Sequence, residues 1–248
     1  MLNYRIHGDG PPLVLLHGFG ISFNIWNGLR PLLVDHFTCI EVELPGIGLS
    51  PLPLPDSSYP AAAVDALDSL RNSLALPRWS VLGYSSGSRI AEAYLQTNPA
   101  RVERAVFLCP ARTSADKAFG LRVASAIDMR FPQLGTWTLS GWRIRFLIHL
   151  LGFNLRRHSP VDAWRDEIIS QPVDILKATL RSMPEGGSRP FEFPDSIPAL
   201  FVWGKEDWIT ATPKRPSRRE VIIHADHSMP QTKTKEAAEM IVPFLIGR

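Results

Sequence analysis

The stretch Trp79-Ser-Val-Leu-Gly-Tyr-Ser-Ser-Gly-Ser-Arg-Ile-Ala91 determines the fold that we predict for the rest of the chain. Its first four residues, 79–82, form an apolar run typical of a buried strand, and residues 89–95 have the spacing of a helix that packs on a sheet. Gly-Tyr-Ser-Ser-Gly, residues 83–87, joins the two. A G-x-S-x-G turn between a strand and a helix predicts a nucleophile elbow, a strained turn that exposes its central residue, here Ser85.

Small residues on either side of the predicted elbow support this interpretation. Gly83 and Gly87 leave room for the close approach of strand and helix that a sharp turn requires. The N–H groups from Ser86 onward open the helix, so they point at a nearby anion. A five-residue pattern also occurs by chance, and the alternative at this point is a turn without chemistry. Ser86 and Ser88 are rival serines.

Length and composition are those of one large α/β domain or two small ones. The chain has 248 residues, of which 45% are apolar, and its formal net charge is +3. It contains no run of Lys and Arg and no nucleic-acid motif, so we expect no nucleic-acid partner. Cys39 and Cys109 lie in apolar runs and are predicted to be buried free thiols.

The sequence shows no targeting or membrane segment. The first residues lead directly into strand-like sequence, without the pattern of a signal peptide. No run approaches the roughly 20 apolar residues that a membrane helix needs. We therefore expect a cytoplasmic protein without a membrane span.

Strand and helix patterns alternate along most of the chain. Apolar runs that predict strands cover residues 4–7, 13–16, 37–42, 79–82, 102–108, 197–203 and 221–224. Helical patterns cover residues 23–34, 61–74, 89–95 and 235–246. Repeated β-α units predict a mostly parallel sheet flanked by helices. Between residues 111 and 194 the alternation gives way to a helical pattern, so we predict a core of residues 1–110 and 195–248 with a helical cap, or lid, at 111–194.

Several motifs occur in an order that is typical of one family. They are Leu13-Val-Leu-Leu-His-Gly-Phe-Gly20, Leu44-Pro-Gly-Ile-Gly-Leu-Ser50, the elbow, Trp203-Gly-Lys-Glu-Asp207 and Ala225-Asp-His227. With them the chain resembles the α/β-hydrolase family, which implies the α/β-hydrolase fold with a cap inserted after its sixth-strand position. The first half looks most like small capped carboxylesterases such as the pimeloyl carrier-protein methyl ester esterases. Other members of the family are dehalogenases, epoxide hydrolases, hydroxynitrile lyases, perhydrolases and hormone receptors.

The resemblance implies a catalytic triad in the order nucleophile, acid, histidine. Ser85 is the candidate nucleophile, and a serine here argues against dehalogenases and epoxide hydrolases, which need a carboxylate. His227 is the candidate base because its pKa lies near neutrality, with His224 as its rival. Asp207 would hold the histidine tautomer, with Glu206 beside it. Asp226 stands before His227 where the family usually has glycine, so it could perturb the imidazole.

The same resemblance implies the remaining parts of the site. The oxyanion hole would be the backbone N–H groups of Phe19 and Ser86, and His17 is expected to be structural. Candidate substrate-binding side chains are Phe19, Trp137, Trp142 and Phe146. No cluster has the spacing of metal ligands, so we predict no metal and no cofactor.

The cap sequence allows two interpretations. Its aromatic residues are interleaved with Arg122, Arg130, Arg143, Arg145, Arg156 and Arg157. In one interpretation they form a lid whose aromatic side chains are buried while the arginines face water. In the other they form an apolar acyl pocket under a basic rim, which would attract an anionic group such as an acyl carrier protein.

Together these features predict a serine hydrolase that cleaves a small-molecule carboxylic ester through an acyl-enzyme intermediate. The acyl part of the ester is expected to be apolar. Two alternatives stay open. One is a carbon–carbon bond hydrolase or lyase that uses the same triad, and the other is a ligand-sensing receptor on the hydrolase fold.

Overall fold

The structure is a computed structural model of the chain. It describes residues 1–53, 57–112, 123, 126–144, 159–187, 190–207, 209–210, 212–214, 216–217 and 219–248. The strands are β1 (Tyr4–His7), β2 (Pro12–Leu16), β3 (Thr38–Val42), β4 (Trp79–Tyr84), β5 (Val102–Leu108), β6 (Ala199–Gly204) and β7 (Glu220–Ile223). The longer helices are α2 (Tyr59–Ser73), α3 (Gly87–Thr97), α7 (Ser159–Ser170), α8 (Val173–Gly187) and α10 (Thr234–Leu245). The short helices are η1 (Phe23–Trp26), α1 (Arg30–Leu33), η2 (Pro99–Arg101), α5 (Pro132–Thr138) and α9 (Met229–Thr232). Among the described residues, no helix combines the length and the apolar character that crossing a membrane requires.

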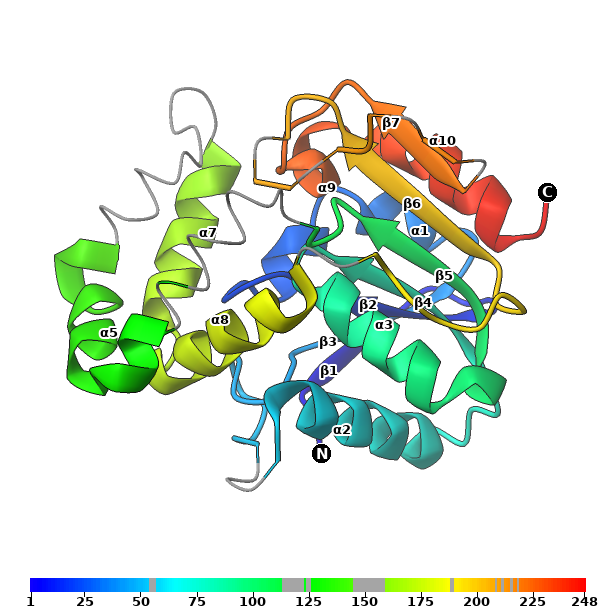
Figure 1. Ribbon diagram of the computed structural model, residues 1–248. Helices are drawn as coiled ribbons and strands as arrows, with labels where there is room; N and C mark the ends of the chain where they lie inside the picture. Colours follow the sequence, from blue (N-terminus) through cyan, green and yellow to red (C-terminus); the bar gives the residue numbers. More distant parts are fainter. Residues whose placement is uncertain are drawn as a thin grey trace.

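The seven strands form one sheet in the order β1-β3-β2-β4-β5-β6-β7. Only β1 runs antiparallel to its neighbour, and the other pairs are parallel. Helices α1 and α10 cover one face and α2 and α3 cover the other (Figure 1). The predicted mostly parallel sheet flanked by helices is confirmed.

The central strands are buried on both faces, which explains their continuous apolar sequences. On β2, Leu13 and Leu15 belong to the core beneath α1 and α10, whereas Val14 and Leu16 belong to the core beneath α2 and α3. All six residues of β4 are buried. A sheet with two apolar faces leaves its edges and strand ends for polar chemistry.

The register brings the carboxyl ends of four strands together. Leu16 of β2 pairs with Gly83 of β4, and Leu108 of β5 pairs with both Tyr84 of β4 and Val202 of β6. Loops that follow β2, β4, β5 and β6 therefore leave the sheet along one edge. This is where open α/β sheets bind their ligands.

The turn after β4 has the strained geometry of the predicted elbow. Ser85 has a φ of 50°, in the left-handed region that non-glycine residues rarely adopt. Helix α3 starts directly against the end of β2, since a Cβ added at Gly87 would lie 2.3 Å from the His17 carbonyl oxygen and 2.5 Å from that of Leu16. Glycine is therefore required at position 87 for close approach.

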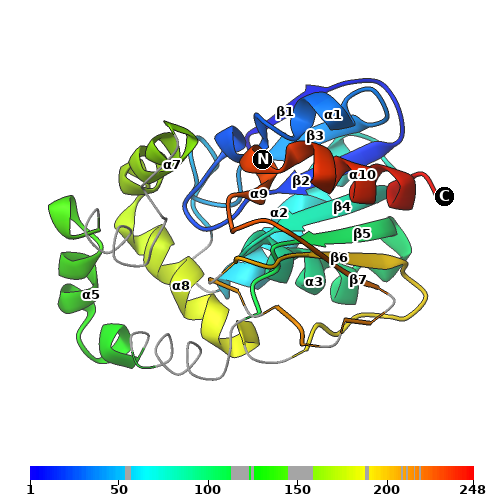
Figure 2. The ribbon, with the colours of Figure 1, turned by 90° about the horizontal axis from the view of Figure 1, so that it is seen from above.

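Helices α5, α7 and α8 lie together beyond the carboxyl edge of the sheet, with α8 beside α2 (Figures 1 and 2). This helical part follows β5, the fifth strand of the observed sheet. Apolar side chains of α7 and α8 pack against glycines in two loops of the core. A Cβ added at Gly20 would lie 3.0 Å from Leu176 and 3.1 Å from Ile168, and one at Gly46 would lie 2.5 Å from Ile175. The cap boundaries at residues 111 and 194 stay a prediction.

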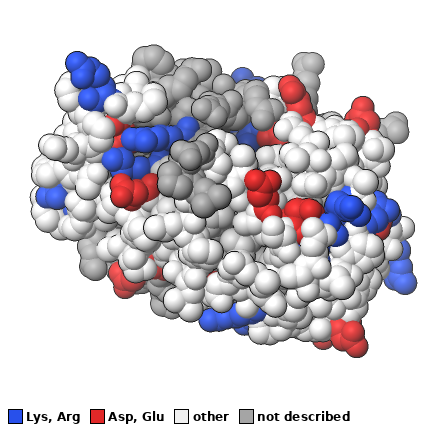
Figure 3. Space-filling model, turned by 90° about the horizontal axis from the view of Figure 1, so that it is seen from below, with Lys and Arg blue, Asp and Glu red and all other residues white. Residues whose placement is uncertain are grey.

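Basic side chains on α8 are paired within the cap. Lys177 Nζ lies 3.1 Å from Asp128 Oδ1, and the Arg181 guanidinium lies 2.5 Å from Asp128 Oδ2. On the face shown in Figure 3, Lys and Arg side chains lie beside Asp and Glu side chains in several places. Of the six arginines in the predicted basic rim, Arg130 and Arg143 are described and the other four lie outside the described residues.

One predicted helix is wrong in its extent. Residues 23–34, expected as one helix, form the 3₁₀ turn η1 and the short helix α1 instead. Gly28 has a low helix propensity, and Pro31 has no N–H to continue an earlier helix, so it stands in the first turn of a new one.

We expect Gly87→Ala to destabilise the protein strongly. The added methyl group would overlap two backbone carbonyl groups, and overpacking of this kind costs about 3 kcal/mol. Gly141→Ala is the control, because a Cβ there meets nothing within 4 Å and only the φ of 60° opposes it, at a cost of about 1 kcal/mol. Urea unfolding measures both. Equal losses in the two variants would contradict the tight contact at Gly87.

Candidate active site

Three side chains predicted from the sequence meet at the carboxyl edge of the sheet. His227 Nε2 lies 2.9 Å from Ser85 Oγ, and His227 Nδ1 lies 2.8 Å from Asp207 Oδ2. Ser85 comes from the elbow, Asp207 from the loop after β6 and His227 from the loop after β7. Asp207 and His227 are buried and Ser85 is half-buried. The structure brings the three residues together, and their catalytic roles stay a prediction.

Asp207 is fixed by a set of donors. Its Oδ1 accepts the backbone N–H groups of Ile209 and Thr210 at 2.9 and 3.1 Å, and its Oδ2 accepts the Thr210 hydroxyl at 2.7 Å. Burial by itself raises the pKa of Asp207, but the charge and hydrogen bond of His227 and the bonds from Thr210 hold that pKa below its usual value. The sequence analysis missed Thr210, although a hydroxyl three residues after an aspartate is typical of such a turn.

The protons of the triad follow from these partners. An ionised carboxylate can only accept hydrogen bonds, so His227 Nδ1 carries a proton and donates a hydrogen bond to Asp207. The Nε2 atom then has a free lone pair, and it accepts a hydrogen bond from the Ser85 hydroxyl. The arrangement is the one in which an acid sets the tautomer of a base and the base activates a hydroxyl.

The rival residues Ser88 and His224 have other partners. Ser88 Oγ donates to the Ser85 carbonyl at 2.5 Å and accepts the Ala111 N–H at 2.9 Å, so its role is local. The prediction that His224 lies inside the last strand is wrong, because β7 ends at Ile223 and the His224 side chain is exposed. Its Nδ1 lies 2.9 Å from Glu206 Oε1, in a surface pair away from the triad.

Asp226 is turned away from the imidazole that follows it. Its side chain is exposed, and Oδ1 accepts the Ser228 N–H at 2.9 Å and the Ser228 hydroxyl at 2.5 Å. These bonds hold the turn that leads into α9. Asp226 therefore stabilises the backbone beside His227 and does not take the place of Asp207.

The predicted oxyanion groups lie beside the elbow. A Cβ added at Gly18 would lie 3.2 Å from Ser85 Cβ, so the loop of Phe19 is in contact with the turn. Ser86 is the N-cap residue of α3, where amide groups and the helix dipole favour an anion. In the part of the chain that the structure describes, neither the Phe19 nor the Ser86 amide donates to a protein acceptor. The oxyanion role of both amides stays a prediction.

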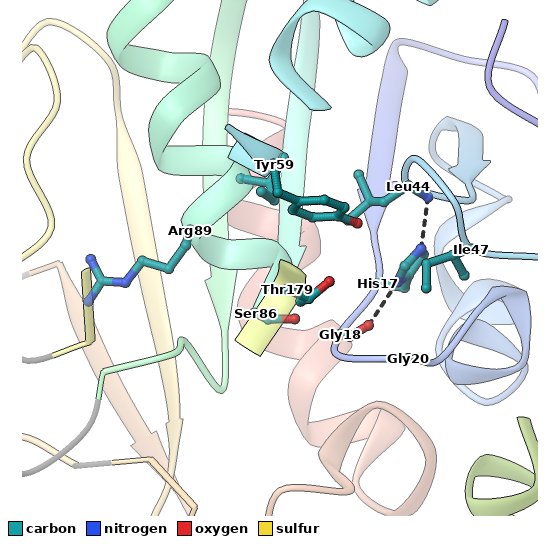
Figure 4. A pocket seen from close by; sticks show the side chains of 10 residues that line it. His17, Gly18, Gly20, Leu44, Ile47, Tyr59, Ser86, Arg89 and Thr179 are labelled. Carbon is teal, nitrogen blue, oxygen red and sulfur yellow. Dashed lines mark hydrogen bonds between the residues drawn. The ribbon is translucent and has the colours of Figure 1, made fainter. Parts of the chain in front are cut away.

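His17 joins two loops behind this site. Its Nδ1 donates to the Gly18 carbonyl at 2.8 Å, and its Nε2 accepts the Leu44 N–H at 2.9 Å (Figure 4). Burial lowers the pKa of His17 to about 4, so the ring is neutral at pH 7. A narrow cavity of about 10 Å³ lies between this ring, Tyr59 of α2, Thr179 of α8 and Ser86, enough for about one water molecule.

Of the predicted substrate-binding side chains, Phe19, Trp137 and Trp142 are described. Phe19 is half-buried and packs on the core. Trp137 and Trp142 are 56% and 68% exposed, and the Arg143 guanidinium lies 4.3 Å from the centre of the Trp137 ring. Phe146 lies outside the described residues. Substrate contact by these four residues stays a prediction.

Among the described residues, one group of side chains could hold a metal ion. The Cys109 thiol and the ligand atoms of Asp207 and His227 lie within 4.8 Å of one another. Burial raises the pKa of Cys109 well above its usual value, and the neighbouring charges of Asp207 and Asp226 raise it further. A protonated thiol is a poor metal ligand. The group suits proton transfer better than metal binding, and the absence of a metal stays a prediction.

The comparison with protein families decides the classification. The family model of the alpha/beta hydrolase fold matches residues 11–230. The chain belongs to the α/β-hydrolase family. Members of this family place a serine elbow, an acid and a histidine in the chain order that is found here.

Curated relatives agree with this family and differ in activity. The chain is 28% identical over 260 residues to a pimeloyl-[acyl-carrier protein] methyl ester esterase of Aeromonas hydrophila, covering 96% of each protein. It is 33% identical over 199 residues to a soluble epoxide hydrolase of a Corynebacterium species, covering 73% of this chain and 68% of the relative. It is 32% identical over 122 residues to an uncharacterised protein of Mycobacterium tuberculosis, covering 49% of this chain and 36% of the relative. The chain therefore spans only about a third of the length of that relative.

Solved structures support the fold. A thermophilic esterase of Thermogutta terrifontis superposes with a TM-score of 0.76 at 23% identity, covering 99% of this chain and 93% of the esterase. At this identity the likeness shows the shared α/β-hydrolase fold alone.

We expect the stability of the protein to fall as the pH drops from 6.5 to 4 because of His17. Its pKa is about 4 in the folded chain and near 6.5 in the unfolded chain, so the unfolded chain binds the proton first. The contribution is fully present above pH 6.5 and is lost toward pH 4, by about 3 kcal/mol. Urea unfolding between pH 7.5 and 4 measures the loss.

His17→Gln should flatten this pH dependence, and His36→Gln, at an exposed position, should leave the loss in place. If His17→Gln shows the same slope as the wild type, burial of a neutral His17 is not the cause.

Proposed function

We propose that the protein is a serine hydrolase that cleaves a carboxylic ester through an acyl-enzyme intermediate. The observation that carries this proposal is the continuous hydrogen-bonded chain from Ser85 through His227 to Asp207. A serine hydroxyl is a weak nucleophile until a base takes its proton. The hydrogen bonds between Ser85, His227 and Asp207 supply that base in the correct tautomer.

In the first half of the reaction, Ser85 Oγ attacks the ester carbonyl carbon while His227 Nε2 takes the hydroxyl proton. The negative charge on the carbonyl oxygen is stabilised by the Phe19 and Ser86 amides, each worth about 3 kcal/mol in such sites. The imidazolium is stabilised by Asp207 and then protonates the alcohol, which leaves. In the second half a water molecule attacks the acyl-enzyme by the same proton transfers, and the acid and Ser85 are released.

An ester suits the site better than an epoxide. The Corynebacterium relative is named as an epoxide hydrolase, but that chemistry needs a carboxylate where this chain has Ser85. The Aeromonas relative, which aligns along almost the whole chain, is named as an esterase that acts on an acyl-carrier-protein ester. We therefore propose an ester with an apolar acyl part as substrate, an acyl carrier protein or another anionic partner as its carrier, and a cytoplasmic location.

Ser85→Ala should abolish turnover of activated esters such as p-nitrophenyl esters, with kcat reduced about 10⁴-fold or more, because no other group can form the acyl-enzyme. A fluorophosphonate should add one label to the wild type, and peptide mapping should place it on Ser85. Ser86→Ala is the matched control, since it removes a neighbouring hydroxyl and keeps the backbone N–H. Label on Ser86 or Ser88, or wild-type turnover in Ser85→Ala, would refute the proposal.

Substitution of the two acids near His227 should affect kcat very differently. Asp207→Asn should lower kcat by about 10⁴-fold, because an amide favours the wrong histidine tautomer. Asp226→Asn should change kcat less than threefold, because its carboxylate binds Ser228 and not the imidazole. Steady-state kinetics on one ester, with circular dichroism to check folding, makes the comparison. Comparable losses in both variants would show that the role of the acid is misassigned.

A further inference from the structure

Tyr84, the last residue of β4, contacts His227 in two ways. Its hydroxyl donates to the His227 carbonyl oxygen at 2.7 Å, between residues 143 positions apart in the chain. Its ring centre lies 5.2 Å from the centre of the imidazole, with the planes inclined by 39°. Tyr84 therefore holds both the main chain and the ring of the candidate base, although it has no place in the triad.

Tyr84 is itself firmly fixed. It is 1% exposed, and its ring makes an edge contact with Trp26 at 6.3 Å between ring centres. On another side a Cβ added at Gly18 would lie 2.9 Å from the ring, so the loop that carries Phe19 also packs on it. Burial raises the pKa of Tyr84 well above its usual value, and the neighbouring groups of Cys109, Asp207 and Asp226 raise it further. The hydroxyl stays protonated and remains a donor.

The backbone around His227 is held residue by residue. The Ala225 carbonyl accepts the Glu206 N–H at 3.0 Å, and the Asp226 carbonyl accepts the Met229 N–H at 3.3 Å. The His227 carbonyl is bound by Tyr84. The loop from β7 thus has a separate anchor at the residue whose side chain must face Ser85.

We propose that Tyr84 is a positioning residue that sets the distance between Ser85 Oγ and His227 Nε2. The proposal rests on the proposed function of the triad. Tyr84 and Ser85 are consecutive in the chain, so one rigid turn carries the hydroxyl and also the anchor of the base. Any motion of the elbow then moves both groups together, and the 2.9 Å separation is preserved. Proton transfer depends steeply on such geometry.

Tyr84→Phe tests this proposal, with Tyr94→Phe as the matched control. Tyr94 is also 1% exposed, its hydroxyl donates to Asp68 Oδ1 at 3.0 Å, and its ring lies 5.8 Å from that of Trp79. Both variants lose one buried phenol hydroxyl and its hydrogen bond, but only the first loses a contact with His227. We expect Tyr84→Phe to lower kcat about 3–30-fold with KM within twofold, and Tyr94→Phe to leave both within twofold.

One labelling measurement and two spectroscopic measurements separate positioning from general packing. The rate of fluorophosphonate labelling at Ser85 should fall in Tyr84→Phe by the same factor as kcat. The downfield proton resonance of His227 Nδ1 should weaken or broaden in Tyr84→Phe and persist in Tyr94→Phe. In the wild type, a nuclear Overhauser contact between the Tyr84 and His227 rings is expected, and its absence would overturn the proposal even if a variant does not fold.

The outcomes distinguish the two proposals. If Ser85→Ala is inactive and Tyr84→Phe matches the wild type, the role of Tyr84 is wrong and the proposed function stands. Equal losses of kcat in Tyr84→Phe and Tyr94→Phe, following their thermal stabilities, would also overturn positioning in favour of packing. If Ser85→Ala keeps its turnover, the proposed function itself fails.

Discussion

The contact between the start of α3 and the end of β2 is the constraint on which the rest of the site depends. At Gly87 the helix backbone lies so close to the Leu16 and His17 carbonyls that no side chain fits between them. This contact brings the Ser86 amide to the loop that carries Phe19, and it forces Ser85 into a left-handed conformation with a φ of 50°. The strained turn at Ser85, the N-terminus of α3 and the position of the loop that carries Phe19 are therefore linked through one close approach.

The double-sided core explains why the polar groups gather at one edge. Residues 13–16 of β2, all of β4 and residues 105–108 of β5 are buried, so a charged residue among them would lose its hydration without a partner. At the carboxyl ends of the strands, the loops supply hydrogen-bond donors, and these offset the cost of removing a charged group from water. Asp207 is the clearest case, since it stays ionised although buried, because His227, Thr210 and the Ile209 amide share its charge. The same donors that make burial tolerable also aim the carboxylate at the imidazole.

Features that depend on short stretches of sequence could be predicted, whereas features that depend on contacts between residues far apart in the chain could not. Ser85, Asp207 and His227 could be predicted because each follows an apolar strand and a short motif in a family order. The single helix expected at residues 23–34 was wrong, since Gly28 and Pro31 divide it. The placement of His224 was wrong because the strand ends one residue earlier, at Ile223. The bond of Tyr84 to the His227 carbonyl spans 143 positions, and no local pattern encodes it.

The loop that carries Phe19 is held from two sides, and this links the cap to the turn at Ser85. From the core side, the neutral ring of His17 binds the Gly18 carbonyl and the Leu44 amide. From the cap side, Leu176 and Ile168 pack against Gly20, the residue after Phe19. Because both contacts flank the Phe19 amide, a displacement of α8 cannot leave the loop unaffected. Docking of the cap and the position of the Phe19 amide thus depend on the same packed atoms, so a shift of α7 or α8 is also felt in the loop beside Ser85.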